Sequence, residues 1–189
     1  VKIGEYANVD TKNIQLNFYD EDEEKKRVKK ELGINIMKDN NKIVGYYSDD
    51  NNKYTIGIEI KQLQNSFYLI AIIIHELCHH ILINLKSVPY KSEEDEWLTD
   101  LLAIAYGFGI FIGNSKFSIT QWQGNLVAGW TASSQGYLPQ QATGYAMAEI
   151  EMRKENKRNP KWLKYCTPNL KSDFKSSMKY LKLKSIIRE

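Results

Sequence analysis

Residues 70–79 read Ile-Ala-Ile-Ile-Ile-His-Glu-Leu-Cys-His, a strongly apolar run that ends with three polar side chains. Consecutive isoleucines by themselves favour a strand, because β-branched side chains are restricted in a helix. The polar residues favour a helix instead, since His75, Glu76 and His79 share one face only at helical spacing. We therefore predict a helix over about residues 67–85.

The pattern His-Glu-x-x-His at 75–79 is suited to holding and using a metal ion. At about 100° per residue the two imidazoles lie about 40° apart, so both can reach one ion. Zinc suits this ligand set, and a catalytic zinc needs a third protein ligand and an open water position. Glu76 is placed to take a proton from that water. A chance match is the alternative, but two histidines and a glutamate are costly to bury in an apolar helix without a partner. His80, on the flank of this face, is expected to be a surface or supporting residue.

The third ligand is expected to be a carboxylate, because all three histidines fall within residues 75–80. Glu96 and Asp100 are four residues apart and therefore share a helical face. If Glu96 binds the metal, Asp100 can accept the outer N–H of a ligating histidine and fix its tautomer. An acidic helix N-terminus explains part of this cluster equally well, but it does not explain an acid among leucines at position 100. The candidates are Glu93, Glu94, Asp95, Glu96 and Asp100.

HELCH at 75–79 followed by EWLTD at 96–100 resembles the zincin metallopeptidases, and within them the gluzincin branch. The resemblance covers roughly residues 53–108. It implies a zincin-like fold and peptide-bond hydrolysis at a Zn²⁺ ion. The implied roles are Zn²⁺ ligation by His75, His79 and Glu96, a catalytic base at Glu76, and support of a zinc histidine by Asp100. The small intracellular ImmA-type repressor-cleaving peptidases are similar in size and also have no secretory signal.

The chain departs from the thermolysin type of gluzincin, in which a later histidine stabilises the oxyanion, because no histidine follows residue 80. A donor is still needed to balance the negative charge that develops in the transition state. Tyrosine is the natural replacement, and Tyr137 and Tyr145 each follow a glycine near a helix-starting position. We therefore predict that Tyr137 or Tyr145 is this donor. A core or surface role is the alternative for each, since the chain has 12 tyrosines.

The layout predicts a single α+β domain over residues 1–189. A small mixed or antiparallel sheet is expected to pack on the HExxH helix, and the C-terminal half is expected to be mostly helical. Residues 1–62 are predicted to be mainly sheet with one helix, residues 63–113 to hold the metal-binding helices, and residues 114–189 to be loop-rich and then helical. No internal repeat or low-complexity linker argues for a second domain.

Several elements can be placed along the chain. Runs at 43–47 and 53–60 flank an Asp-Asp-Asn-Asn turn and predict a hairpin. The second strand could offer an edge to an extended substrate or be an interior strand, and the sequence favours neither. Asn65 or Ser66 is expected to cap the metal-binding helix. Further helices are predicted at Glu21–Leu32, at Glu94–Phe108 with Leu98, Leu101, Leu102 and Ala105 as its apolar stripe and glycines ending it, from Pro139 to Lys157, and after Pro168.

The net charge of +3 is unevenly distributed. Residues 153–189 contain twelve Lys/Arg and three Asp/Glu, a net charge of +9. A nucleic-acid-binding role for this part is one interpretation. The other is a solvated helix exterior, because Leu170, Phe174, Met178 and Leu181 recur on one helical face between the lysines. The second interpretation is the stronger one.

Nothing in the sequence predicts export or membrane insertion. Residues 1–20 do not have the basic region and apolar run of a signal peptide, and no uninterrupted apolar stretch approaches the roughly 20 residues of a membrane span. Two cysteines, Cys78 and Cys166, are too few for a disulfide framework. We expect a cytoplasmic zinc peptidase with a protein or peptide substrate, no membrane partner and room for a regulatory partner. The rival hypotheses are a zincin-like binding or sensor module with little turnover, and a nucleic-acid-binding protein.

Overall fold

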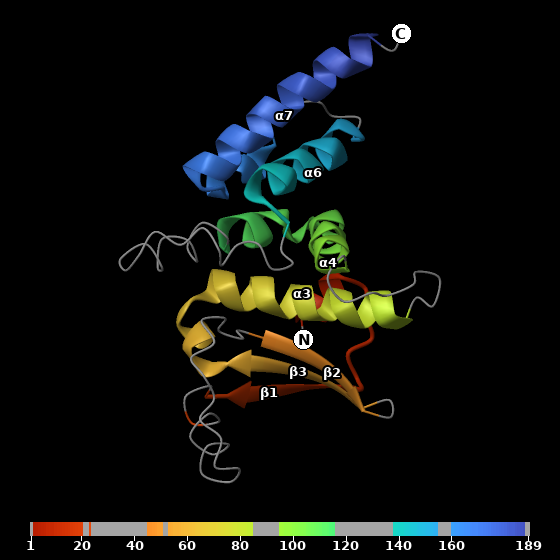
Figure 1. Cartoon of the computed structure of the whole chain (residues 1–189), viewed down its shortest axis with the longest axis vertical. Helices are drawn as coiled ribbons and strands as arrows, with labels where there is room; N and C mark the ends of the chain where they lie inside the picture. The colour runs from red at the N-terminus through yellow and green to blue at the C-terminus, as the bar shows by residue number, and fades with distance from the viewer. Residues whose placement is uncertain are drawn as a thin grey trace. The chain divides into compact units, whose positions relative to one another are not determined.

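The computed structural model describes residues 2–20, 23, 45–50, 53–84, 95–115, 138–154 and 160–187. The chain divides into two compact units, Val1–Pro89 and Tyr90–Glu189. A small three-stranded mixed sheet and a predominantly helical remainder confirm the predicted α+β class (Figure 1). The boundary between the units falls inside the segment 63–113 that holds both predicted metal-binding helices, and the prediction of a single domain stays a prediction.

The sheet of the first unit has the strand order β1-β3-β2. Strands β2 (Gly45–Asp50) and β3 (Lys53–Glu59) are antiparallel, and Asp50 pairs with Lys53 across the turn. The predicted hairpin is therefore confirmed. β3 is hydrogen-bonded to a neighbouring strand on each side. Of the two roles considered for it, β3 is therefore an interior strand and offers no edge to a substrate.

Strand β1 (Ile14–Tyr19) is a strand that the sequence analysis did not predict. It runs parallel to β3, with Leu16 opposite Ile56. Ile14, Leu16 and Phe18 alternate with polar residues, which is the period of a strand and could have revealed it. The parallel pairing makes the sheet mixed and requires the long connection that lies between the two strands.

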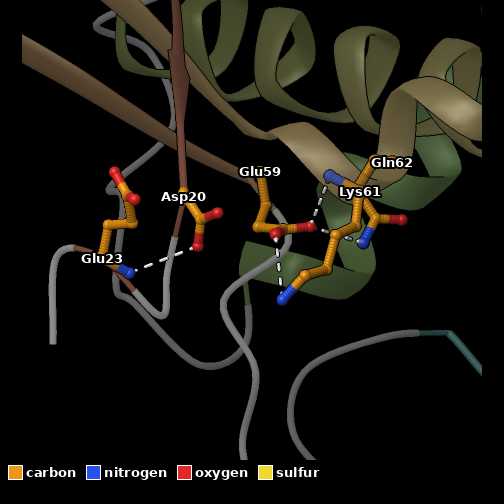
Figure 2. A network of polar contacts seen from close by, with 5 residues as sticks. All are labelled: Asp20, Glu23, Glu59, Lys61 and Gln62. Atoms are coloured by element: carbon orange, nitrogen blue, oxygen red, sulfur yellow. Dashed lines mark hydrogen bonds and ion pairs between the residues drawn. The ribbon is translucent and has the colours of Figure 1, made fainter. Parts of the chain in front are cut away.

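A short 3₁₀ turn, η1 (Ile60–Gln64), leads from the sheet to the helix that carries the HExxH pattern. The buried carboxylate of Glu59 starts this turn: its Oε2 atom accepts hydrogen bonds from the Lys61 N–H at 3.0 Å and from Gln62 Nε2 at 3.4 Å. Lys61 Nζ lies 3.8 Å from the other oxygen of the Glu59 carboxylate (Figure 2). In a separate contact, the Asp20 carboxylate accepts a hydrogen bond from the backbone N–H of Glu23. The direction in which the chain leaves β3 is therefore set by a side chain at its end.

Helix α3 (Ser66–Asn84) confirms the helix predicted over residues 67–85 almost to the residue. Asn65 caps it, because its side-chain oxygen accepts from the N–H groups of Phe67 and Tyr68 at 3.0 and 3.4 Å. Such a cap satisfies backbone donors that the first turn leaves unpaired, and its loss typically costs about 1 kcal/mol.

Helix α3 lies along one face of the sheet and packs on β2 and β3 (Figure 1). Ile56 and Ile58 have no exposed surface, and residues 71–79 of the helix are all buried. Each fully buried isoleucine side chain contributes about 1.5–3 kcal/mol. The isoleucine run that suggests a strand in isolation therefore lies in a buried part of a helix. Helix α1 (Lys2–Tyr6) also packs on α3, and the predicted helix 21–32 lies outside the described residues except for Glu23.

The first described helix of the second unit lies where the sequence predicts it but is less regular than predicted. Helix α4 (Asp95–Ala103) passes into a π-helical turn, η2 (Ile104–Phe108), and the chain is helical again over residues 109–115. Gly107 is the one glycine of this stretch with a positive φ, 92°. The predicted break at the glycines is therefore confirmed at Gly107, where the backbone leaves helical geometry and the helix kinks, whereas residues 109 and 113 lie in the helical stretch that follows.

The predicted apolar stripe of this helix is also wrong in part. Leu101 is 40% exposed and residue 105 is exposed, whereas the buried residues are Thr99, Asp100, Ala103 and Ile104. The helix turns a polar residue inward because Asp100 has a backbone partner there, as described below. The predicted stripe is therefore wrong at Leu101 and Ala105, whereas Leu98 and Leu102 are half-buried.

Helices α6 (Gln140–Met152) and α7 (Pro168–Ile187) pack against each other and confirm the helices predicted after Pro139 and Pro168, although α6 ends at Met152 rather than at the predicted Lys157. A short turn, η3 (Lys161–Tyr165), precedes α7. The predicted apolar face of α7 is buried, with Leu170, Phe174 and Leu181 inward and Met178 packed against them. The core of this unit consists of Ile104, Leu138, Met147, Ala148, Leu163, Cys166, Leu170, Phe174 and Leu181.

Two helical stretches of the described part, Ser66–Asn84 and Glu96–Ser115, are long and apolar enough to cross a membrane by length and composition alone. The most apolar windows of the two are 56% and 44% buried within the protein. Core helices of soluble proteins pass the same test, and the expectation of no membrane partner stays a prediction.

Candidate metal centre

His75 and His79 face each other on consecutive turns of α3. Their Nε2 atoms lie 3.0 Å apart, and their rings meet edge to face with centroids separated by 4.7 Å. Both are buried, with 5% and 6% of their surfaces exposed. The predicted convergence of the two imidazoles on one point is therefore present in the first unit.

This spacing fits a shared metal ion. Two nitrogens bound to one zinc at about 2.0–2.1 Å and a tetrahedral angle lie about 3.3–3.4 Å apart. The observed Nε2–Nε2 distance of 3.0 Å has to open by only about 0.3 Å to reach that arrangement. Without a metal, one ring can donate an N–H to the other, which would hold the same orientation.

Glu76 lies on the same helix between the two histidines and is 6% exposed. Its Oε1 atom approaches the backbone of Gly45, the first residue of β2: a Cβ atom built on Gly45 would lie 3.1 Å from it. The carboxylate therefore lies against the sheet at a point where the strand has no side chain. Sequence reasoning did not single out Gly45, because nothing local marks its contact with a residue 31 positions later.

His80, the third histidine, is tied to the sheet. Its Nδ1 atom lies 3.0 Å from the Tyr47 hydroxyl and 3.2 Å from Asn84 Nδ2. The Tyr54 ring meets the imidazole edge to face at 4.4 Å between centroids. His80 is half-buried, so it is a supporting residue rather than a surface one, and these contacts help to fix the helix on the sheet.

Glu96 and Asp100 lie one turn apart on α4, in the second unit. Glu96 is half-buried, whereas Asp100 is 1% exposed. Oδ2 of Asp100 accepts the backbone N–H of Leu138 at 2.9 Å, which anchors the chain just before α6. A buried carboxylate needs such partners, and this bond explains an acid among leucines within its own unit. The predicted hydrogen bond from a ligating histidine to Asp100 stays a prediction.

Of the two tyrosines proposed as oxyanion donors, only Tyr145 lies among the described residues. Tyr137 lies outside the described residues. Tyr145 lies on α6, where its hydroxyl donates to Glu149 Oε1 at 3.2 Å and its ring packs near Tyr180 at 6.4 Å between centroids. The role of either as a donor stays a prediction.

The two thiols are buried, and they belong to different units. Cys78 is 0% exposed and lies among the buried residues of α3. Burial raises the pKa of Cys166 to about 11, and the nearby Lys171 ammonium opposes this only in part. Neither thiol has the exposed, activated character of a nucleophile.

Three of the predicted site residues have side chains of the types that bind metal ions. Two buried imidazoles of the first unit and the half-buried carboxylate of Glu96 in the second are, by type, a group that could hold a metal ion. Nitrogen and carboxylate donors suit zinc, and two histidines with one glutamate are the ligands of one group of catalytic zinc sites. These residues therefore fit the predicted metal, and no other such group occurs among the described residues.

The comparisons with known proteins contribute no relative. No protein-family model matches the chain, and no curated protein or solved structure is significantly similar to it.

Proposed function

We propose that this chain is a zinc-dependent peptidase with a zincin-like active site, acting on protein or peptide substrates. The observation that carries the proposal is the pair of buried Nε2 atoms of His75 and His79, 3.0 Å apart, on the helix that also carries the buried Glu76. Burying three such groups is costly in a helix that only stabilises the fold, whereas a metal site requires them. The proposal includes Glu96 as the third ligand and Asp100 as the support of a zinc-ligating histidine.

Zinc held by these residues would supply a Lewis acid and a water whose pKa is lowered to about 7. The remaining steps belong to the chain. The Glu76 carboxylate accepts a proton from the attacking water while the water oxygen forms a bond to the carbonyl carbon of the substrate. When the carbon–nitrogen bond breaks, Glu76 returns that proton to the departing amine. Tyr137 or Tyr145 is proposed to donate a hydrogen bond to the oxyanion.

A zincin-like binding or sensor module is the second candidate, because the same ligands could hold a structural ion. Such a module has no need for a catalytic base beside its metal, whereas this chain buries Glu76 on the helix that carries the two histidines. The nucleic-acid-binding alternative receives less support. The face of α7 that alternates with its lysines is buried in the core of the second unit, so an amphipathic helix accounts for the charge pattern.

Glu76→Gln tests the proposal against the binding module. Loss of the base is expected to lower kcat by about 10²–10⁴-fold on a generic substrate such as fluorescein-labelled casein, with zinc content unchanged. Glu5→Gln, the same substitution at an exposed residue of α1, is the control and is expected to leave kcat unchanged. Equal cleavage by wild type and Glu76→Gln, with zinc bound to both, would favour the binding module.

A further inference from the structure

Strand β2 approaches helix α3 closely at Gly45. A Cβ atom at this position would lie 2.5 Å from Ile72 Cγ2 and 3.1 Å from Glu76 Oε1. The first distance is shorter than real Cβ contacts, and the second is tighter than most. Gly45 is therefore in close approach to two side chains of α3 at once.

The two neighbours of Gly45 are four residues apart, so they lie side by side on one face of the helix. Ile72 is 7% exposed, and its Cγ2 methyl is fixed directly to a β-branched carbon, which leaves it little freedom to move aside in a helix. A side chain on Gly45 therefore has to displace the strand, the helix or the Glu76 carboxylate.

Contacts further along β2 limit how the strand can respond. Tyr47, two residues on and on the same face, is bound to His80 of α3, and Gly45 pairs with Ile58 in the sheet. Strand and helix are thus joined one helical turn beyond Glu76. With both ends of this contact fixed, Glu76 is the neighbour with the most rotatable bonds and the least resistance to displacement.

We propose that Gly45 is a positioning residue for Glu76: its missing side chain lets the carboxylate lie against the strand backbone, in the position from which it accepts the proton of water. This inference rests on the proposed function. It predicts that a methyl group at residue 45 displaces the base without disturbing the imidazoles of His75 and His79, which bind the metal through the same helix.

The experiment compares wild type, Gly45→Ala and Gly57→Ala. Gly57 is a matched control, because it lies in the neighbouring strand, and a Cβ there would meet only the Tyr46 ring among its nearest neighbours, at 2.0–2.5 Å. Tyr46 is exposed and does not lie on the α3 side of the sheet, so its ring can move aside without affecting Glu76. For each protein, zinc affinity is measured by competition with a chelating dye, and kcat and KM are measured with fluorescein-labelled casein.

Gly45→Ala is expected to lower kcat by about 10–100-fold, the effect of misplacing a catalytic group by a fraction of an ångström to one ångström. KM and zinc affinity are expected to stay within about twofold of wild type, because neither depends on the base. Gly57→Ala is expected to keep the wild-type kcat. A merely structural defect in Gly45→Ala would instead lower zinc affinity together with kcat.

The contact with Ile72 could prevent Gly45→Ala from folding, so a second pair keeps the inference testable. Ile72→Ala removes the Cγ2 methyl that a Cβ at residue 45 would meet at 2.5 Å, and Gly45→Ala/Ile72→Ala then places the new methyl beside Glu76 without that clash. The double variant is expected to have a kcat about tenfold below that of Ile72→Ala, and its crystal structure is expected to show the Glu76 carboxylate displaced relative to that of Ile72→Ala. Equal kcat values and an unmoved carboxylate would overturn the inference.

The two levels of the proposal fail differently. If Glu76→Gln cleaves casein as fast as wild type, the proposed function is wrong and the role of Gly45 is lost with it. If Glu76→Gln is inactive while Gly45→Ala keeps the wild-type kcat, the peptidase assignment stands and only the role of Gly45 is wrong.

Discussion

The hydroxyl of Tyr47 lies 3.0 Å from Nδ1 of His80, so the third histidine of helix α3 is tied to the sheet. Its neighbour His79 faces His75 instead, with their Nε2 atoms 3.0 Å apart. Consecutive histidines of one helix thus have different partners, because they are about 100° apart around its axis. This division of roles can be tested directly.

Zinc content separates the two histidines. His79→Ala is expected to lose bound zinc, because one imidazole and one carboxylate are too few ligands for a stable site. His80→Ala, the same substitution one residue later, is expected to keep one zinc ion per chain. Elemental analysis of the purified proteins measures both, and loss of zinc from His80→Ala but not from His79→Ala would show that the site has been assigned to the wrong histidine.

The third ligand can be identified by comparing Glu96→Gln with Asp100→Asn. Removal of a direct ligand is expected to lower zinc affinity by more than about 100-fold, whereas a supporting carboxylate typically contributes about 10–100-fold. Asp100→Asn keeps an oxygen that can accept the Leu138 N–H, so the anchor before α6 is retained. Chelator competition measures both affinities. A larger loss in Asp100→Asn would make Asp100 the ligand.

The bond between Tyr47 and His80 is expected to stabilise the first unit. Tyr47→Phe removes a half-buried hydroxyl from its partner and should lower the free energy of unfolding by about 0.5–1.5 kcal/mol in urea denaturation. Tyr46→Phe is the control, since the exposed Tyr46 hydroxyl bonds only Asn17 among its described hydrogen-bond partners, at 3.2 Å. Its loss should change stability by less than about 0.5 kcal/mol. Equal effects of the two substitutions would contradict the prediction.

The raised pKa of Cys166 predicts that the protein loses stability in alkaline solution. Its pKa is raised by burial to about 11 in the folded protein, from an ordinary value of 9.0. Because the unfolded chain gives up this proton at lower pH, the stability present below pH 9 is lost as the pH rises toward 11. Cys166→Ala is expected to lose less stability over this range than wild type. Urea denaturation at several pH values measures the difference, and parallel curves for the two proteins would refute it.

Local spacing in the sequence was enough to predict several elements correctly. Helix α3, its Asn65 cap and the face shared by His75 and His79 follow from contacts between residues two to four positions apart. Such contacts form wherever the helix forms. The β2–β3 hairpin and the buried face of α7 were predictable for the same reason, because turn residues and a regular apolar repeat act over short distances.

The tertiary structure decided everything that joins distant parts of the chain. The parallel pairing of β1 with β3 makes β3 an interior strand, and the partners of His80 come from strands more than 25 residues earlier. The inward turn of Asp100 depends on Leu138, 38 residues away. Gly45 shows the reason most clearly: its contact with Glu76 exists only when sheet and helix are packed together. Burial and close packing select such contacts among many possible pairings, and no spacing in the sequence records which one is chosen.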